Sequence, residues 1–104
     1  MLNRLSLSGR VGRKLETRVT PGGVPLTRFT LAHRSQQLED GLPVLTVLNI
    51  LVVAAGKTLS DAAEHLQEGQ AVVVEGFLNR AKLRERQSRL VLHAQEINAD
   101  LDAP

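Results

Sequence analysis

Alternation between apolar and polar residues recurs along most of this chain, and only one segment has helical spacing instead. Successive side chains of a strand point to opposite faces, so alternation of this kind predicts half-buried β-strands. Three such segments, which are alternating, apolar or β-branched, come before the helical one, at 3–11, 25–34 and 42–55. Two more follow it, at 71–78 and 90–97. The chain is therefore expected to be an all-β protein.

The single predicted helix runs from Gly56 to Gly69. Thr58 is expected to cap its N-terminus, with Asp61 three residues later, and Gly69 is expected to close its C-terminus. A short helix between the third and fourth strands is typical of the oligonucleotide-binding (OB) fold, a five-stranded barrel. The order of elements therefore predicts an OB-fold barrel, and the length of the chain suits a single domain over residues 1–104.

Glycine and proline mark the predicted bends. Gly9 interrupts the first strand, which indicates a bulge or a sharp bend. Thr20–Gly23 contains one proline and two glycines, so it predicts a tight reversal. The polar segment Ser35–Gly41 is expected to be a loop. Leu42–Ala55 carries no charge and predicts a strand covered on both faces, by a second core layer or by a subunit interface.

The amino-acid composition restricts which side chains can build the core and which covalent or metal-binding groups are present. The chain has no cysteine, which excludes disulfides and thiolate metal sites and favours a reducing cytoplasm. Its first residues contain no apolar targeting segment, so export and membrane insertion are not expected. Phe29 and Phe77 are its two aromatic residues, so leucine and valine must build the core. Both phenylalanines are expected to be buried there, with base stacking as an alternative for Phe77.

Positive charge is concentrated between the last two predicted strands, in residues 79–89. This segment, the basic arm, has five arginine or lysine residues against one acid, Glu85, so its net charge is +4 in a chain whose total is +2. Charge of this density is typical of a nucleic-acid groove. The basic residues are Arg80, Lys82, Arg84, Arg86 and Arg89. The first four recur at every second position, so in an extended arm they would point the same way.

Two other interpretations of the basic arm stay open. Charged loops are common on small proteins, and the arm would then be a solvated hairpin tip. Residues 81–87 are also good helix formers, and neither glycine nor asparagine marks a turn among them. The net charge of the arm is the same in either conformation.

Five short motifs, in order and at matching spacing, resemble those of the PriB family (primosomal replication protein N). They are Asn3-Arg4-Leu5 with Leu7-Ser8-Gly9, Pro21-x-Gly23-Val24-Pro25, Phe29-x-Leu31-x-His33-Arg34-Ser35, Val74-x-Gly76-Phe77 and Leu90-Val91-Leu92-His93-Ala94. The resemblance spans nearly the whole chain. It implies a bacterial, homodimeric OB-fold protein that binds single-stranded DNA and helps to restart stalled replication forks alongside the PriA helicase and DnaT.

The resemblance also implies the positions of DNA-contacting residues. Five basic residues match places where family members hold such contacts: Arg18, Arg34, Lys82, Arg84 and Arg89. Charge and spacing alone add Arg80 and Arg86 to this set. All seven are predicted to contact nucleic acid.

The third predicted strand departs from the family pattern. Family members can offer aromatic side chains there for bases to stack on, whereas this chain has Leu42, Val44 and Val47. Because base–aromatic stacking contributes about 1–3 kcal/mol per base, binding here is expected to depend more heavily on phosphates. With about four phosphates neutralised, the logarithm of affinity should fall with the logarithm of salt concentration at a slope of about −3.

Catalysis and metal binding find little support in the residue pattern. His33, His65 and His93 lie far apart in the sequence, and each is expected to be a structural histidine. The sequence has no zinc-type histidine pair, no phosphate-binding loop with a lysine and no glycine-flanked serine. The chain is therefore not expected to be an enzyme or to hold a metal or cofactor.

Three functions from different classes fit these observations. The favoured one is a DNA-binding accessory protein of replication restart. A second is an interaction adaptor with weak or lost DNA binding, in which Leu42–Ala55 or the acidic pair Glu39–Asp40 docks a helicase. The third is an RNA-binding OB protein, which is disfavoured because such proteins use clusters of exposed aromatic residues.

Overall fold

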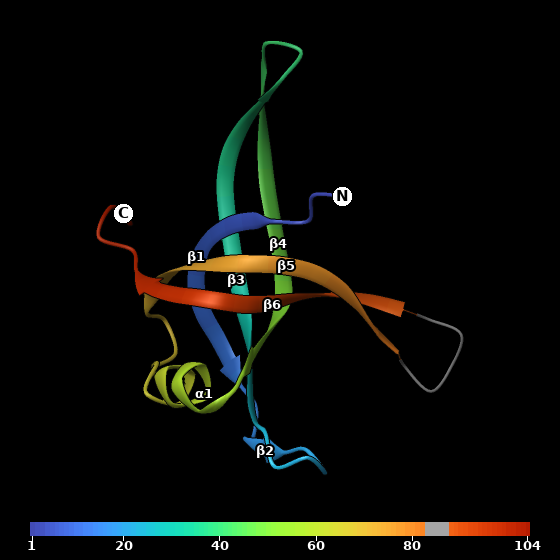
Figure 1. The fold of residues 1–104 in the computed structure, drawn as a ribbon. Coiled ribbons are helices and arrows are strands. Elements are labelled where there is room, and N and C mark those ends of the chain that lie inside the picture. The colour runs from blue at the N-terminus through green and yellow to red at the C-terminus, as the bar shows by residue number, and fades with distance from the viewer. Residues whose placement is uncertain (83–87) are drawn as a thin grey trace.

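Five strands of the sheet close into a barrel (Figure 1). The computed structural model describes residues 1–82 and 88–104. The barrel strands are β1 (Leu5–Lys14), β3 (Pro25–Glu39), β4 (Leu42–Ala55), β5 (Ala71–Lys82) and β6 (Ser88–Ala99). They lie in the order β1-β5-β6-β4-β3, and pairing of β1 with β3 closes the ring. The helix α1 (Lys57–Glu64) lies between β4 and β5, so the predicted OB fold is confirmed.

The strand β1 belongs to two sides of the barrel because it bends near Gly9. Its first half pairs with β5 and its second half with β3, while Arg10 is paired on both sides. A Cβ atom at Gly9 would lie 2.5 Å from the carbonyl oxygen of Ala32, so a larger residue does not fit where the two strands cross. The bend predicted at Gly9 is confirmed.

Aliphatic side chains fill the barrel interior, as the composition predicts. Phe29 is fully buried among them, which confirms its predicted place in the core. Ala63 and Leu66 add contacts from α1 and the turn after it. The buried barrel residues occur at every second position of their strands: Val11, Phe29, Leu31, Val52, Ala54, Val72, Val74, Leu92 and Ala94. The positions between them face outward and form the exterior face of the barrel.

The hairpin of β3 and β4 extends well beyond the barrel (Figure 1). The loop predicted over Ser35–Gly41 is wrong, because β3 continues to Glu39 and pairs with β4 without interruption. The turn is confined to Asp40 and Gly41, with φ angles of 51° and 74°, the left-handed values that a two-residue hairpin turn requires. Residues 35–39, which are polar except for Leu38, remain extended because their backbone groups pair across the hairpin.

The helix is shorter than predicted. It begins after Gly56, whose φ of 96° suits glycine, and no side chain caps it, so the predicted cap at Thr58 is wrong. Gly69 has a φ of 87° but lies beyond the helix, where its N–H donates to the Val11 carbonyl oxygen at 2.7 Å. The Ser60 hydroxyl, buried 2.6 Å from that of Thr27, anchors the helix on β3. In the described part of the chain, no helix has the length and apolarity needed to cross a membrane.

Candidate nucleic-acid interface

Arginines gather on the exterior face of β3 and its neighbour β2 (Arg18–Val19). Arg28 and Arg34 alternate with the buried Phe29 and Leu31, so they point away from the core. Arg18 is paired with Leu26, which lies on the same face of β3 as Arg28. Directly paired antiparallel residues share a face, so the three arginines belong to one surface. Arg18 and Arg34 are exposed, and Arg28 is half-buried.

The basic arm starts as a two-stranded extension of β5 and β6, away from α1 and the C-terminus (Figure 1). Arg80 is paired with Leu90, and Arg89 with Ala81, so the two arginines lie on opposite faces of the ladder. Both are exposed. Arg89 is on the exterior face, because it lies four residues before the outward-facing His93 and so has the same strand phase.

Lys82 lies at the end of β5, where its backbone pairs with Ser88. Residues 80–82 are therefore in a strand, and the helical alternative does not apply to them. Arg84 and Arg86 lie outside the described residues.

Four arginines of β2, β3 and β6 point outward on the exterior face: Arg18, Arg28, Arg34 and Arg89. Arg10, which is paired with Ala32 of β3, shares this face, but its guanidinium donates to the carbonyl oxygens of Gly69 and Pro104. Arg80 is on the other face of the arm. Arg28 was not among the predicted site residues. The signal that identifies it is the alternation within β3, since Arg28 and Arg34 have the same phase relative to Phe29.

Phe77 and His93 form a stacked pair on the exterior face. They are paired residues of β5 and β6, and their ring centroids lie 5.0 Å apart with an angle of 6° between the ring planes. Both are half-buried, and neither belongs to the core, so the prediction of a buried Phe77 is wrong. The physical reason is strand phase: Leu78 packs against the core, and its neighbour Phe77 must therefore face outward.

The aliphatic residues that replace the family's third-strand aromatics are exposed. Leu42 is 65% exposed and Val47 is 61% exposed, and Val44 lies between them on β4. Val47 is paired with Arg34 and so shares the exterior face. The strand predicted to be covered on both faces is thus largely uncovered over its first half within the described chain.

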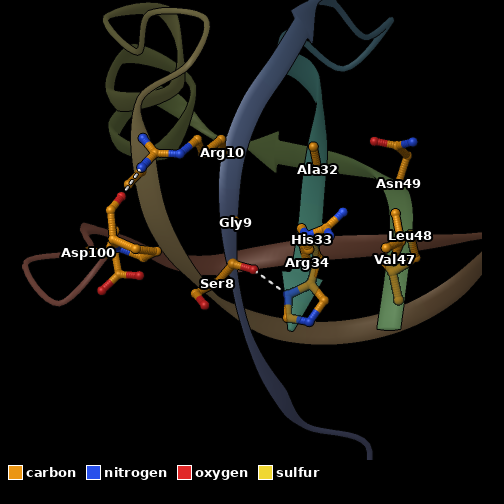
Figure 2. A pocket seen from close by; sticks show the side chains of 13 residues that line it. Ser8, Gly9, Arg10, Ala32, His33, Arg34, Val47, Leu48, Asn49 and Asp100 are labelled. Atoms are coloured by element: carbon orange, nitrogen blue, oxygen red, sulfur yellow. Dashed lines mark hydrogen bonds between the residues drawn. The ribbon is translucent and has the colours of Figure 1, made fainter. Parts of the chain in front are cut away.

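A groove of about 410 Å³ lies beside Arg34, where β1 crosses β3 (Figure 2). His33 reaches across it, and its Nδ1–H donates to the Ser8 carbonyl oxygen at 2.6 Å. Its Nε2 lies 2.7 Å from the Ser35 hydroxyl oxygen. Both ring nitrogens of His33 are therefore engaged, and its predicted structural role is confirmed.

Comparisons with known proteins agree with this geometry. A model of a family described as another single-strand binding protein family matches residues 3–96. The replication restart protein PriB of Proteus mirabilis is 37% identical over 95 residues, which cover 91% of this chain and 90% of that protein. The chain belongs to the PriB family. The PriB of an Enterobacter species is also 37% identical, over 98 residues that cover 94% of each protein.

Solved structures place the chain in the same fold as PriB. The PriB of Ralstonia solanacearum has a TM-score of 0.81 at 24% identity and covers 95% of this chain and 98% of its own. The small single-stranded DNA-binding protein of Streptomyces coelicolor has a TM-score of 0.71 at 29% identity and covers 97% of this chain and 96% of its own. The OB barrel of the PriB family therefore positions the arginines described above.

Proposed function

We propose that this chain binds single-stranded DNA and serves as a non-enzymatic accessory protein of bacterial replication restart. The observation that carries the proposal is the gathering of four arginines on one exterior face of an OB barrel. Relatives at 37% identity are named replication restart proteins, which supports the cellular role. The protein would act in the cytoplasm, where the chromosome is replicated.

Binding would depend on phosphates. Guanidinium groups of Arg18, Arg34 and Arg89 are exposed, and each pairs with a phosphate without reading its base. Arg28 lies among them as a fourth contact. Arg80, Lys82, Arg84 and Arg86 add positive charge to the arm, which attracts the strand and holds the part of it that leaves the exterior face.

A homodimer is part of the proposal. The first half of β1 pairs with β5 along one edge, and in the described chain no strand pairs with its other edge. The exposed side chain of Leu48, which is paired with His33, lies near that edge, around the groove that Ser8 and His33 line. A second copy adding its own strand there would satisfy the backbone groups of the edge that His33 does not already bind and would cover Leu48.

Light scattering coupled to size exclusion would test the dimer. The native chain is expected at about twice its 11.3 kDa. Ser6→Pro removes a backbone donor on the free edge of β1, because Ser6 has the same phase as Ser8, whose carbonyl faces that edge. The variant is expected to elute as a monomer with an unchanged β-rich circular dichroism spectrum. A native monomer at micromolar concentration, or a dimeric Ser6→Pro variant, would contradict this interface.

The chain would also act by binding other proteins of replication restart. By resemblance to the PriB family, the PriA helicase and DnaT are the partners we propose. The observation that favours an adaptor role is the exposed apolar run on β4, where Leu45 is 58% exposed. In the adaptor alternative, this run docks the helicase and DNA contributes little to assembly.

Binding of three labelled nucleic acids would separate the candidate functions. The native protein is expected to bind oligo-dT at least tenfold more tightly than duplex DNA, because a flexible single strand adapts its phosphates to the curved arginine face. Oligo-U is expected to bind no more tightly than oligo-dT. Fluorescence anisotropy at fixed salt provides the measurement. A preference for oligo-U would favour the RNA-binding alternative, and no binding to any of the three would favour the adaptor.

A further inference from the structure

The stacked pair of Phe77 and His93 has no packing role in the barrel interior. Its rings are nearly parallel, and both side chains are half-exposed on the outer side of the β5–β6 ladder. Because both side chains are half-exposed, part of each ring is accessible from solvent. A further flat group placed on either ring would continue the stack.

The ring pair belongs to a row that crosses the exterior face. His93 is paired with Val53 on β4, and Val53 is paired with Arg28 on β3. Val53 and Arg28 are half-buried, so the row continues from the rings over an apolar floor to a cation. This row suits a nucleotide: the flat base can stack on the rings and lie over the aliphatic group, and the anionic phosphate can pair with the guanidinium.

Charge along the β5–β6 ladder changes sign at the ring pair. Arg80 and Arg89 lie on the arm side, whereas Glu75 and Glu96 are paired with each other on the far side, beyond the irregular pairing at Gly76. Both acids are exposed. A single strand that arrives along the arm would meet two carboxylates if it continued straight on. It is therefore directed across the sheet, over the rings and toward Arg28.

We propose that Phe77 and His93 form a stacking platform for a base of the bound strand. The inference rests on the proposed function, since it specifies where a single strand bound to this face puts one base. Stacking is insensitive to base identity, because every base has a π face. The platform would supply on β5 and β6 the stacking that Leu42, Val44 and Val47 do not supply on β4.

A single tryptophan provides a direct readout of the platform. The chain contains no tryptophan or tyrosine, so Trp in Phe77→Trp would be the dominant emitter. Oligo-dT is expected to quench this emission by stacking on the indole, whereas an abasic oligomer of the same length should not. Ala62→Trp is the matched control, because Ala62 is exposed on α1, and the arm extends away from α1 (Figure 1). Its emission should not respond to oligo-dT.

A second variant measures what the base contact contributes. Phe77→Leu keeps an apolar side chain but removes the ring, and it is expected to weaken oligo-dT binding about tenfold, as for the loss of one stacked base. Its affinity for the abasic oligomer should stay within about twofold of native, because the phosphate contacts are retained. His93→Leu should reduce the preference for oligo-dT in the same direction.

The outcomes distinguish this inference from the proposed function. If oligo-dT binds Phe77→Trp by anisotropy without quenching it, or if Phe77→Leu keeps the native preference for oligo-dT over the abasic oligomer, the platform is overturned while single-strand binding stands. If the native chain binds neither oligomer, both the proposed function and the platform fail. Quenching together with a lost preference supports the platform.

Discussion

Replacing Arg18, Arg34 and Arg89 together by glutamine is expected to weaken oligo-dT binding about fiftyfold at 0.15 M salt. Each phosphate contact on a single strand releases about 0.7 counterion, so each lost contact costs a little over half a decade of affinity at this salt concentration. The three residues are exposed and lie on one face of β2, β3 and β6. Their replacement should leave the folded barrel intact, which thermal unfolding would verify.

A charge-matched control separates local contacts from the total charge of the chain. Thr58→Glu, Ala62→Glu and Gln67→Glu lower the net charge by the same amount at exposed positions of α1 and the turn after it. This variant is expected to bind oligo-dT within about threefold of native, because it removes no guanidinium contact and salt screens exposed charges that do not touch the strand. Equal losses in the two triple variants would show that total charge, not the exterior face, determines affinity.

Alanine at Gly76 is expected to lower the free energy of unfolding by about 3 kcal/mol. Its Cβ would overlap the carbonyl oxygen of His93 on β6 and lie 2.9 Å from the carbonyl carbon. Both atoms belong to the backbone, so no side-chain rotation relieves the clash, and β5 and β6 must separate locally. In a domain of this size the melting temperature should fall by roughly 15 °C, measured by circular dichroism.

Gly22→Ala is the control for the loss of a glycine as such. Gly22 lies in the turn before β3, where the nearest atom to a new Cβ is the Thr20 hydroxyl oxygen at 3.9 Å. Gly22 does not have a positive φ angle, so its backbone conformation is open to alanine. Stability should stay within about 0.5 kcal/mol of native. An unchanged melting temperature in Gly76→Ala would show that the β5–β6 pairing accommodates a side chain at this position.

Strand phase explains what was predictable about the fold. Val72, Val74 and Leu78 repeat at the spacing of one strand face, so the barrel and its core follow from local pattern. The extent of β3 did not follow, because residues 35–39 are polar except for the exposed Leu38 and none of them is buried, so only their pairing with β4 keeps them extended. The amino-acid pattern of such an exposed strand end is the same as that of a polar loop.

The candidate interface was predictable in part. Arg18, Arg34 and Arg89 were expected from family resemblance, and the structure groups them with Arg28, whose strand phase is the same. Which face of the arm each basic residue occupies depends on the register of β5 against β6, and that register is set by the whole barrel. The exposure of Phe77 was missed because the shortage of aromatic residues outweighed its position next to the inward Leu78.

The salt dependence of oligo-dT binding tests the electrostatic account most directly. Between 50 and 300 mM salt, a plot of log affinity against log salt concentration is expected to have a slope of about −3 or steeper for the native protein, since four exterior arginines each contribute about 0.7. In the Arg18, Arg34 and Arg89 triple variant the slope should be shallower by about 2. A native slope near zero, or the same slope in both proteins, would contradict phosphate binding by the exterior arginines.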